Sequence, residues 1–213
     1  MNYDSFARLV QALRTLEGRA QREGLSAFLI TLSLPARFHA QSPCYGGMTP
    51  AHAQAWLIEV WVRVRRRWLQ QGIRVAGVRC VEPHRDGCPH WHLLLWLPTD
   101  RAAEALAGLR QCALADAGNE AGAAKHRVYI EPVDGRRVSA VDYLVKFLGR
   151  PESFRQAAWY ARWQIRPLVL IGDTRVGQPP AGVWRRARDV GASLWRRLRV
   201  GMAAITSRQP AQG

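Results

Sequence analysis

Residues 73–97 read IRVAGVRCVEPHRDGCPHWHLLLWL, and this stretch carries the clearest structural signal in the chain. Two apolar runs flank a polar centre, in which Asp86-Gly87 is a strong turn signal. The pattern predicts a β-hairpin, with one strand over residues 73–81 and the return strand over residues 90–97. We therefore expect an antiparallel sheet built around this hairpin.

Periodic apolar residues predict further elements on both sides of the hairpin. Helical spacing predicts helices over residues 5–22, 50–71, 100–117 and 139–148, with more near 181–208. Compact apolar runs predict strands over residues 27–34, 128–133 and 165–171. Thr49-Pro50 is typical of a helix start, with a threonine N-cap before a first-turn proline. This order favours an α+β fold in which helices pack on one face of the sheet.

The length and composition of the chain suit one core with an appendage. Hydrophobic residues make up 48% of the 213 residues, which is enough to bury a core. We expect a core over residues 1–150 and a basic extension of strand and helix, rich in Trp and Arg, over residues 151–213. From Arg150 onward, 12 arginines face three acidic residues, so nine of the 15 net positive charges lie there. The extension is expected to pack on the core and to end in a helical tail.

The charge of the whole chain is strongly positive. Its 31 Lys and Arg residues against 16 Asp and Glu give a net charge of +15, and Lys125 and Lys146 are its only lysines. Such an excess favours a nucleic acid or an acidic membrane as partner. No apolar run is long enough to span a membrane, and no signal sequence is evident; we expect no membrane partner. The four cysteines form no CxxC pair, which favours a reducing, cytoplasmic setting in a bacterial cell.

The return strand of the hairpin carries two histidines that could share one cation. His90 and His92 are two residues apart, so a strand would place both imidazoles on one face. An odd number of residues in the connection would bring Glu82 to the same face, whereas a two-residue turn would send it to the other. Two imidazoles and a carboxylate suit Mg²⁺ or Mn²⁺ acting on a phosphate. A polar pair on an open face, or a structural zinc site with Cys80 and Cys88, remains an alternative.

Three blocks of the chain resemble the phage replication gene A protein family, whose members are HUH endonucleases. They are FLITLSLPARFH at residues 28–39, the hairpin region at residues 72–95, and YLVKF at residues 143–147. The resemblance implies the nuclease core of a rolling-circle replication initiator that nicks and rejoins single-stranded DNA with a divalent metal. It further implies that Tyr143 is the nucleophile and forms a 5′-phosphotyrosine. Lys146 lies one helical turn beyond Tyr143 and is expected to neutralise the phosphate or the phenolate. Single-stranded or origin DNA would be the substrate, with a host helicase and polymerase as further partners.

The chain departs from the family pattern at two positions. Phe147 stands where the family has a second tyrosine, and Arg85 stands where a further histidine is expected. Loss of the second hydroxyl excludes a mechanism that alternates between two tyrosines. Two alternatives therefore stay open: a catalytically impaired relative that only binds origin DNA, and a mobilisation relaxase or transposase with the same core.

The arginines and tryptophans outside these motifs are expected to have simpler roles in DNA binding or in the core. The arginines expected to contact phosphates, without reading sequence, are Arg63, Arg66, Arg67, Arg162, Arg185 and Arg186. Tryptophans between such arginines could stack on unpaired bases, but their helical spacing favours the core for Trp159, Trp163, Trp184 and Trp195. His39 ends the first block and could lie near the site or have a structural role.

Overall fold

The computed structural model describes residues 3–134, 139–142, 144 and 154–172 of the chain. Its longer helices are α1 (Tyr3–Arg22), α2 (Pro50–Gln70), α3 (Ala102–Leu114) and α6 (Phe154–Trp163), and α4 (Ala123–His126) is a single turn. Its strands are β1 (Leu25–Leu32), β2 (Ala76–Pro83), β3 (Pro89–Pro98), β4 (Val128–Val133) and β5 (Leu168–Gly172). Short 3₁₀ turns lie at Ala36–Phe38 and Thr99–Arg101.

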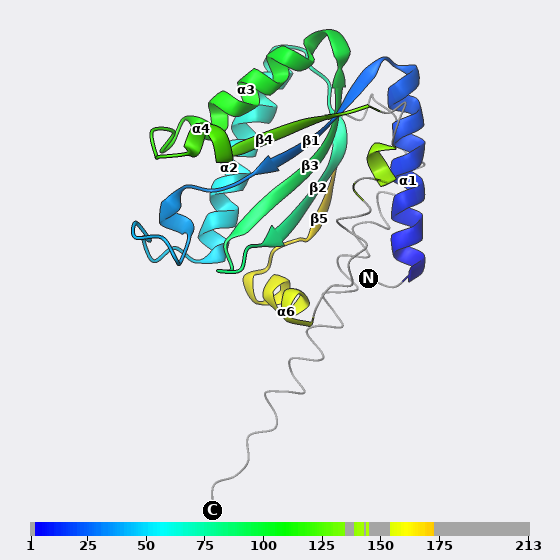
Figure 1. The fold of residues 1–213 in the computed structure, drawn as a ribbon. Helices are drawn as coiled ribbons and strands as arrows, with labels where there is room; N and C mark the ends of the chain where they lie inside the picture. Colours follow the sequence, from blue (N-terminus) through cyan, green and yellow to red (C-terminus); the bar gives the residue numbers. More distant parts are fainter. Residues whose placement is uncertain (1–2, 135–138, 143, 145–153, 173–213) are drawn as a thin grey trace, which may run out of the picture.

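The five strands form one antiparallel sheet in the order β4-β1-β3-β2-β5 (Figure 1). The predicted hairpin, β2 with β3, lies in the middle, and β1 pairs with β3 on its other side. This arrangement confirms the predicted α+β class with an antiparallel sheet. The sequence placed these strands within a few residues of their observed bounds.

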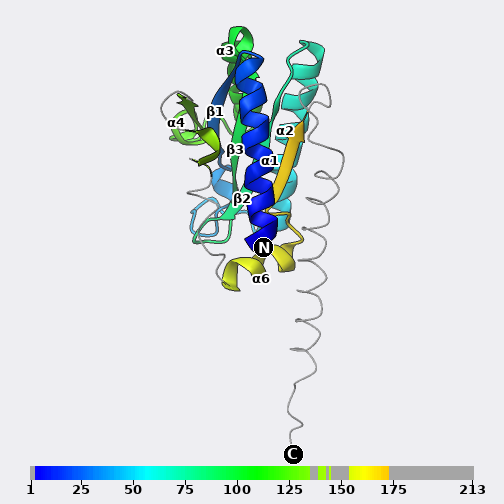
Figure 2. The ribbon, with the colours of Figure 1, turned by 90° about the vertical axis from the view of Figure 1, so that its right-hand side faces the viewer.

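Helices cover both faces of the sheet, so the expectation that they pack on one face is wrong. Leu13, Leu16 and Ala20 of α1 pack on one face, whereas α2 and α3 pack on the other (Figures 1 and 2). The reason is visible in the strands, because residues 76–81 of β2 and 93–97 of β3 are buried without alternation. A strand whose successive residues are all buried must be covered on both sides.

The connection between β2 and β3 fixes which side chains share a face. Pro83 pairs with Pro89, which leaves residues 84–88 as a five-residue connection. Gly87 has a φ of 82°, a left-handed conformation that glycine adopts without steric cost. Because the connection is odd in length, Glu82 pairs directly with His90. The sequence left two registers open, and the observed one places the Glu82 carboxylate on the same face as His90 and His92.

The chain beyond residue 150 contributes to the same sheet. β5 pairs with β2 and forms an edge of the sheet. In α6, the Tyr160 hydroxyl donates to the Val81 carbonyl at 2.5 Å, and the Trp159 indole donates to the Gly87 carbonyl at 3.1 Å. The proposed boundary at residue 150 and the proposed helical tail lie outside the described residues. No helix in the described ranges has the length and hydropathy needed to cross a membrane.

Candidate metal centre

Glu82, His90 and His92 meet on the face of the sheet that α1 covers. The Glu82 carboxylate lies 3.5 Å from His92 Nε2 and 3.9 Å from His90 Nε2. All three side chains are partly buried, and their potential ligand atoms lie within 4.8 Å of one another. Among the described residues this is the only such group of three. The sequence-predicted triad is thus brought together, and it forms a possible metal-binding site.

The donor set fits a divalent cation. Nitrogen or oxygen ligands about 2.1 Å from a metal lie at most about 4.2 Å apart, and both carboxylate–imidazole distances fall within that limit. Burial, followed by the neighbouring His92 and His84, lowers the pKa of His90 to about 3, so His90 is neutral at physiological pH. A neutral imidazole is the form that binds metals.

Thr31 on β1 orients one of the two histidines. The register places Thr31 directly beside His92, and Thr31 Oγ1 hydrogen-bonds His92 Nδ1 at 3.2 Å. This contact leaves Nε2 of the same ring directed at Glu82. Metal-bound histidines usually have such a partner on the other ring nitrogen. The sequence placed Thr31 on a central strand without a role, because only the strand register reveals which residue it faces.

The loop after the first 3₁₀ turn meets the hairpin connection next to the triad. His39 Nδ1 hydrogen-bonds Asp86 Oδ2 at 3.0 Å, and the His84 ring lies between His39 and His90, with a centroid distance of 4.1 Å to His90. Burial opposes ionisation of Asp86, but hydrogen bonds from the Cys88 amide and His39 outweigh it and lower the Asp86 pKa. His39 therefore lies near the site and also has a structural role, so both possibilities raised by the sequence apply.

Cys88, His39 and Asp86 also line up like a thiol nucleophile with its base. Cys88 Sγ lies 3.8 Å from His39 Nε2, while the opposite ring nitrogen contacts Asp86. The thiol is buried, however, and burial raises the pKa of Cys88 to about 12. A thiol in that state is not a nucleophile at neutral pH. The contact stabilises the loop, and the chemistry is better sought at the triad.

A short helical segment packs on the same face as the triad. Ala140, Val141 and Leu144 are fully buried against Leu94 and Trp96, within the cluster that α1 covers. The expected nucleophile Tyr143 precedes Leu144 directly, but Tyr143, Lys146 and Phe147 lie outside the described residues. Ala140, Val141 and Leu144 lie on the face of the sheet that carries Glu82, His90 and His92.

Glu17 of α1 fixes the start of that segment. Its carboxylate is 7% exposed and accepts hydrogen bonds from the Ser139 hydroxyl at 2.7 Å and the Ala140 amide at 2.6 Å. The Asp142 amide donates to Ser139 Oγ at 3.2 Å, a contact typical of a serine N-cap. Arg14 pairs with Asp142 at 2.8 Å. The sequence did not reveal Glu17, although an acidic residue beside Leu13 and Leu16 on an apolar helix face was a signal.

The arginines predicted to contact DNA are spread over the molecule. Arg63 and Arg66 are exposed on α2, on the other side of the sheet from the triad, and Arg162 is exposed on α6. Arg67 donates to Gln111 Oε1 at 2.6 Å and so joins α2 to α3. Arg185 and Arg186 lie outside the described residues. The described arginines of this set that lie on α2 are therefore separated from the triad by the sheet.

The low pKa of His90 predicts an acid-sensitive fold. Folded His90 has a pKa of about 3, against about 6.5 unfolded, so the unfolded chain binds the proton first as the pH falls. The free energy of unfolding should therefore fall by about 1.4 kcal/mol per pH unit between those values. Urea unfolding in EDTA from pH 7 to pH 4 measures this slope. We expect His90→Gln to flatten it and the exposed His126→Gln to leave it unchanged, and equal slopes in all three proteins would contradict the assignment.

Comparison with known proteins places the chain among phage replication proteins. It is 31% identical over 203 residues to a probable replication protein of Pseudoalteromonas phage PM2, covering 84% of this chain and 31% of that protein. It is 32% identical over 199 residues to the replication protein of Haemophilus phage HP1, covering 83% of this chain and 25% of that protein. A probable replication endonuclease from a prophage-like region of Salmonella paratyphi A is 28% identical over 149 residues, covering 67% of the chain and 19% of that protein.

The chain thus spans about a quarter to a third of the length of the first two relatives. No solved structure gives a significant match. The family model described as bacteriophage replication gene A protein matches residues 7–151, a range that includes β1, the hairpin and the segment around Tyr143. These matches confirm the resemblance seen in the three sequence blocks. The chain belongs to the bacteriophage replication gene A protein family.

Proposed function

We propose that this chain nicks and rejoins single-stranded DNA at a replication origin and so initiates rolling-circle replication. The proposed centre is the triad of Glu82, His90 and His92 with Mg²⁺ or Mn²⁺, and the proposed nucleophile is Tyr143. The observation that carries the proposal is the gathering of this triad on the face against which Ala140, Val141 and Leu144 pack. The relatives named as probable replication endonucleases support the same activity.

The cation and the protein would contribute different parts of the chemistry. When bound, the cation acts as a Lewis acid that polarises the scissile phosphate. The Tyr143 phenol loses its proton to solvent and its oxygen attacks phosphorus, while the bond from phosphorus to the 3′ oxygen breaks. The leaving oxygen takes up a proton and becomes a free 3′-hydroxyl, and the 5′-phosphate stays on Tyr143. Attack by a 3′-hydroxyl on that linkage reseals the strand and releases the tyrosine.

The side chains around the triad hold it ready for this step. Thr31 fixes the ring of His92, and Glu17 holds the start of the segment that contains Tyr143. Lys146, one turn beyond Tyr143 in the expected helix, would neutralise the phosphate or the phenolate. We assign the exposed Arg63, Arg66 and Arg162, together with Arg185 and Arg186, to phosphate contacts with DNA outside the cleavage centre, which carry no sequence information. A host helicase and polymerase would act on the nicked product.

A nicking assay tests the proposal. The protein is incubated with a pool of labelled single-stranded oligonucleotides, with Mn²⁺ or with EDTA, and then denatured. We expect a covalent protein–DNA adduct with Mn²⁺ only, accompanied by a shorter strand with a free 3′-hydroxyl. The same sequences in duplex form are expected to give little adduct, because the strand must be unpaired to reach the centre.

One observation favours a second function. Phe147 replaces a tyrosine of the family pattern, as a chain that has lost catalysis and retained binding would allow. On that reading the protein occupies origin DNA without cutting it. Tight, salt-sensitive binding to the oligonucleotide pool with no adduct under any metal would support this origin-binding function and contradict the nickase.

A further inference from the structure

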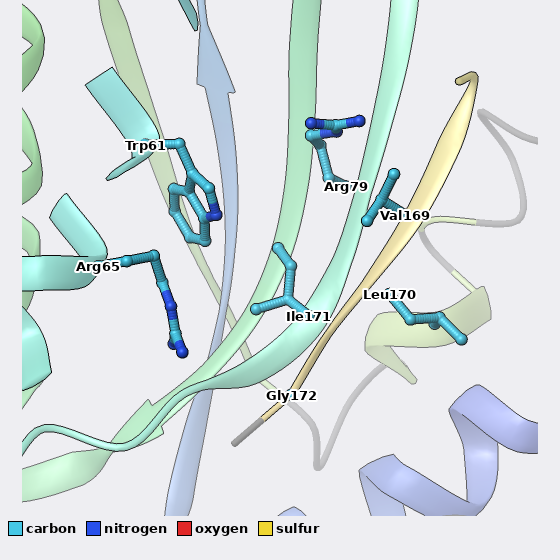
Figure 3. Close-up of a pocket in the computed structure, with 7 residues that line it drawn as sticks. All are labelled: Trp61, Arg65, Arg79, Val169, Leu170, Ile171 and Gly172. Carbon is cyan, nitrogen blue, oxygen red and sulfur yellow. The ribbon is translucent and has the colours of Figure 1, made fainter. Parts of the chain in front are cut away.

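A pocket opens on the face of the sheet opposite the triad, between α2 and the edge strand β5 (Figure 3). Trp61 and Arg65 reach into it from successive turns of α2, and Arg79 reaches it from β2. Val169 and Ile171 of β5 form its apolar wall. The pocket has a volume of about 260 Å³, near the lower end of ligand pockets, which suits a group no larger than one nucleotide.

Arg79 is the unusual member of this lining. Its side chain is 9% exposed, and its Nε is buried without a hydrogen-bond partner in the described structure. The guanidinium lies over the Trp91 ring at 4.2 Å, which occupies one face of the group and none of its N–H donors. No carboxylate of the described residues forms an ion pair with it. A buried cation without an anion is unfavourable, so an anionic ligand would stabilise this arrangement.

The surroundings of Arg79 add positive charge and an aromatic ring. Burial, opposed by Cys80 and assisted by the charge of Arg166, lowers the pKa of Arg79 to about 10, and the group stays protonated at neutral pH. Arg65 brings another guanidinium to the same pocket. The Trp61 indole and Arg65 lie on the α2 side of the pocket, and Arg79, Val169 and Ile171 lie on the sheet side (Figure 3). Guanidinium forks bind phosphate oxygens, and an indole stacks on a nucleobase of any sequence.

We propose that this pocket binds one nucleotide, with its phosphate on Arg65 and Arg79 and its base against Trp61. The ligand is either a nucleotide within a DNA strand or a free nucleoside phosphate, because both present the same groups. The site lies across the sheet from Glu82, His90 and His92, so a strand bound there would be held apart from the cleavage centre. Binding in this pocket requires neither the metal nor cleavage.

Binding measurements in EDTA test the pocket without any contribution from nicking. Fluorescence anisotropy with a fluorescein-labelled (dT)20 strand reports strand binding, and calorimetry with dAMP reports binding of a free nucleotide. The variants are Arg65→Ala, which removes a charge, and Trp61→Leu, which keeps an apolar side chain and changes no charge. Arg74→Ala is the matched control, because Arg74 is exposed and does not line the pocket. Thermal melting verifies that each variant folds.

The two sources of the nucleotide give different results. If the pocket binds a strand, Arg65→Ala and Trp61→Leu each weaken (dT)20 binding about tenfold, whereas Arg74→Ala changes it less than about twofold. If it binds a free nucleotide, dAMP binds the wild-type protein and both pocket variants lose that binding while they retain (dT)20. Folded variants that match Arg74→Ala in both assays would overturn the proposal. A failed nicking assay would leave these outcomes unaffected.

Discussion

Replacing His92 with alanine is expected to reduce Mn²⁺-dependent cleavage of single-stranded DNA by about a thousandfold. The variant removes an imidazole whose Nε2 lies 3.5 Å from the Glu82 carboxylate, and two ligands hold a cation much less firmly than three. Lewis-acid stabilisation of the transition state is worth several kcal/mol, and each 1.4 kcal/mol is about tenfold in rate. Single-turnover cleavage of a labelled strand at saturating protein measures the loss.

Two further variants make this result specific. Glu82→Gln keeps the shape of the side chain and removes its charge, so we expect a loss of similar size and a weaker stabilisation of the fold by Mn²⁺. His126→Ala serves as the control, because His126 is an exposed histidine at the end of α4, outside the triad. Cleavage by His92→Ala at the wild-type rate would contradict the assignment of the metal centre. A rate loss in His126→Ala of the same size would show that the effect is not local.

Replacing Tyr143 with phenylalanine is expected to abolish the covalent adduct altogether. Phenylalanine has no oxygen with which to attack phosphorus, and the change is otherwise small enough to keep DNA affinity within about twofold. Denaturing electrophoresis with Mn²⁺ measures the adduct, and anisotropy in EDTA measures binding. Tyr129→Phe is the control, because Tyr129 is an exposed tyrosine on the edge strand β4. An adduct that persists in Tyr143→Phe would assign the nucleophile elsewhere.

The structure at the hairpin was largely predictable from local sequence. Asp86-Gly87 and the apolar runs specified two antiparallel strands, and the spacing of His90 and His92 specified a shared face. The position of Glu82 depended on the parity of the connection. A turn signal gives the place of a connection but not its number of residues, so sequence alone left two registers, and the observed five-residue connection selects one.

Contacts between distant segments could not be predicted from the sequence. Thr31 meets His92 through the pairing of β1 with β3, and Glu17 meets Ser139 across more than 120 residues. Each of these is a short polar contact that depends on how separate elements pack, and local patterns carry no information on it. The error about the helices has a related cause, since a continuous apolar strand shows that both faces are covered but not by which elements.

The surroundings of Arg79 in the pocket likewise could not be predicted from the sequence. In the sequence it interrupts an apolar strand and gives no sign of its surroundings. Only the fold shows that its guanidinium lies over Trp91 and lines a pocket with Trp61 and Arg65. Arg65, by contrast, is one of four arginines in residues 63–67 of α2, and its inward orientation follows from the helical spacing of the buried Val60, Val64 and Trp68.

Mass spectrometry of the protein–DNA adduct tests the central claim most directly. After nuclease and trypsin digestion, cleavage after Arg137 and Lys146 releases residues 138–146, a peptide whose only tyrosine is Tyr143. The account predicts that this peptide carries the added mass of a nucleotide linked to Tyr143 through its 5′-phosphate, and only in samples prepared with Mn²⁺ or Mg²⁺. A nucleotide on the peptide that contains Tyr160 or Tyr129, or a modified Tyr143 formed equally well in EDTA, would contradict it.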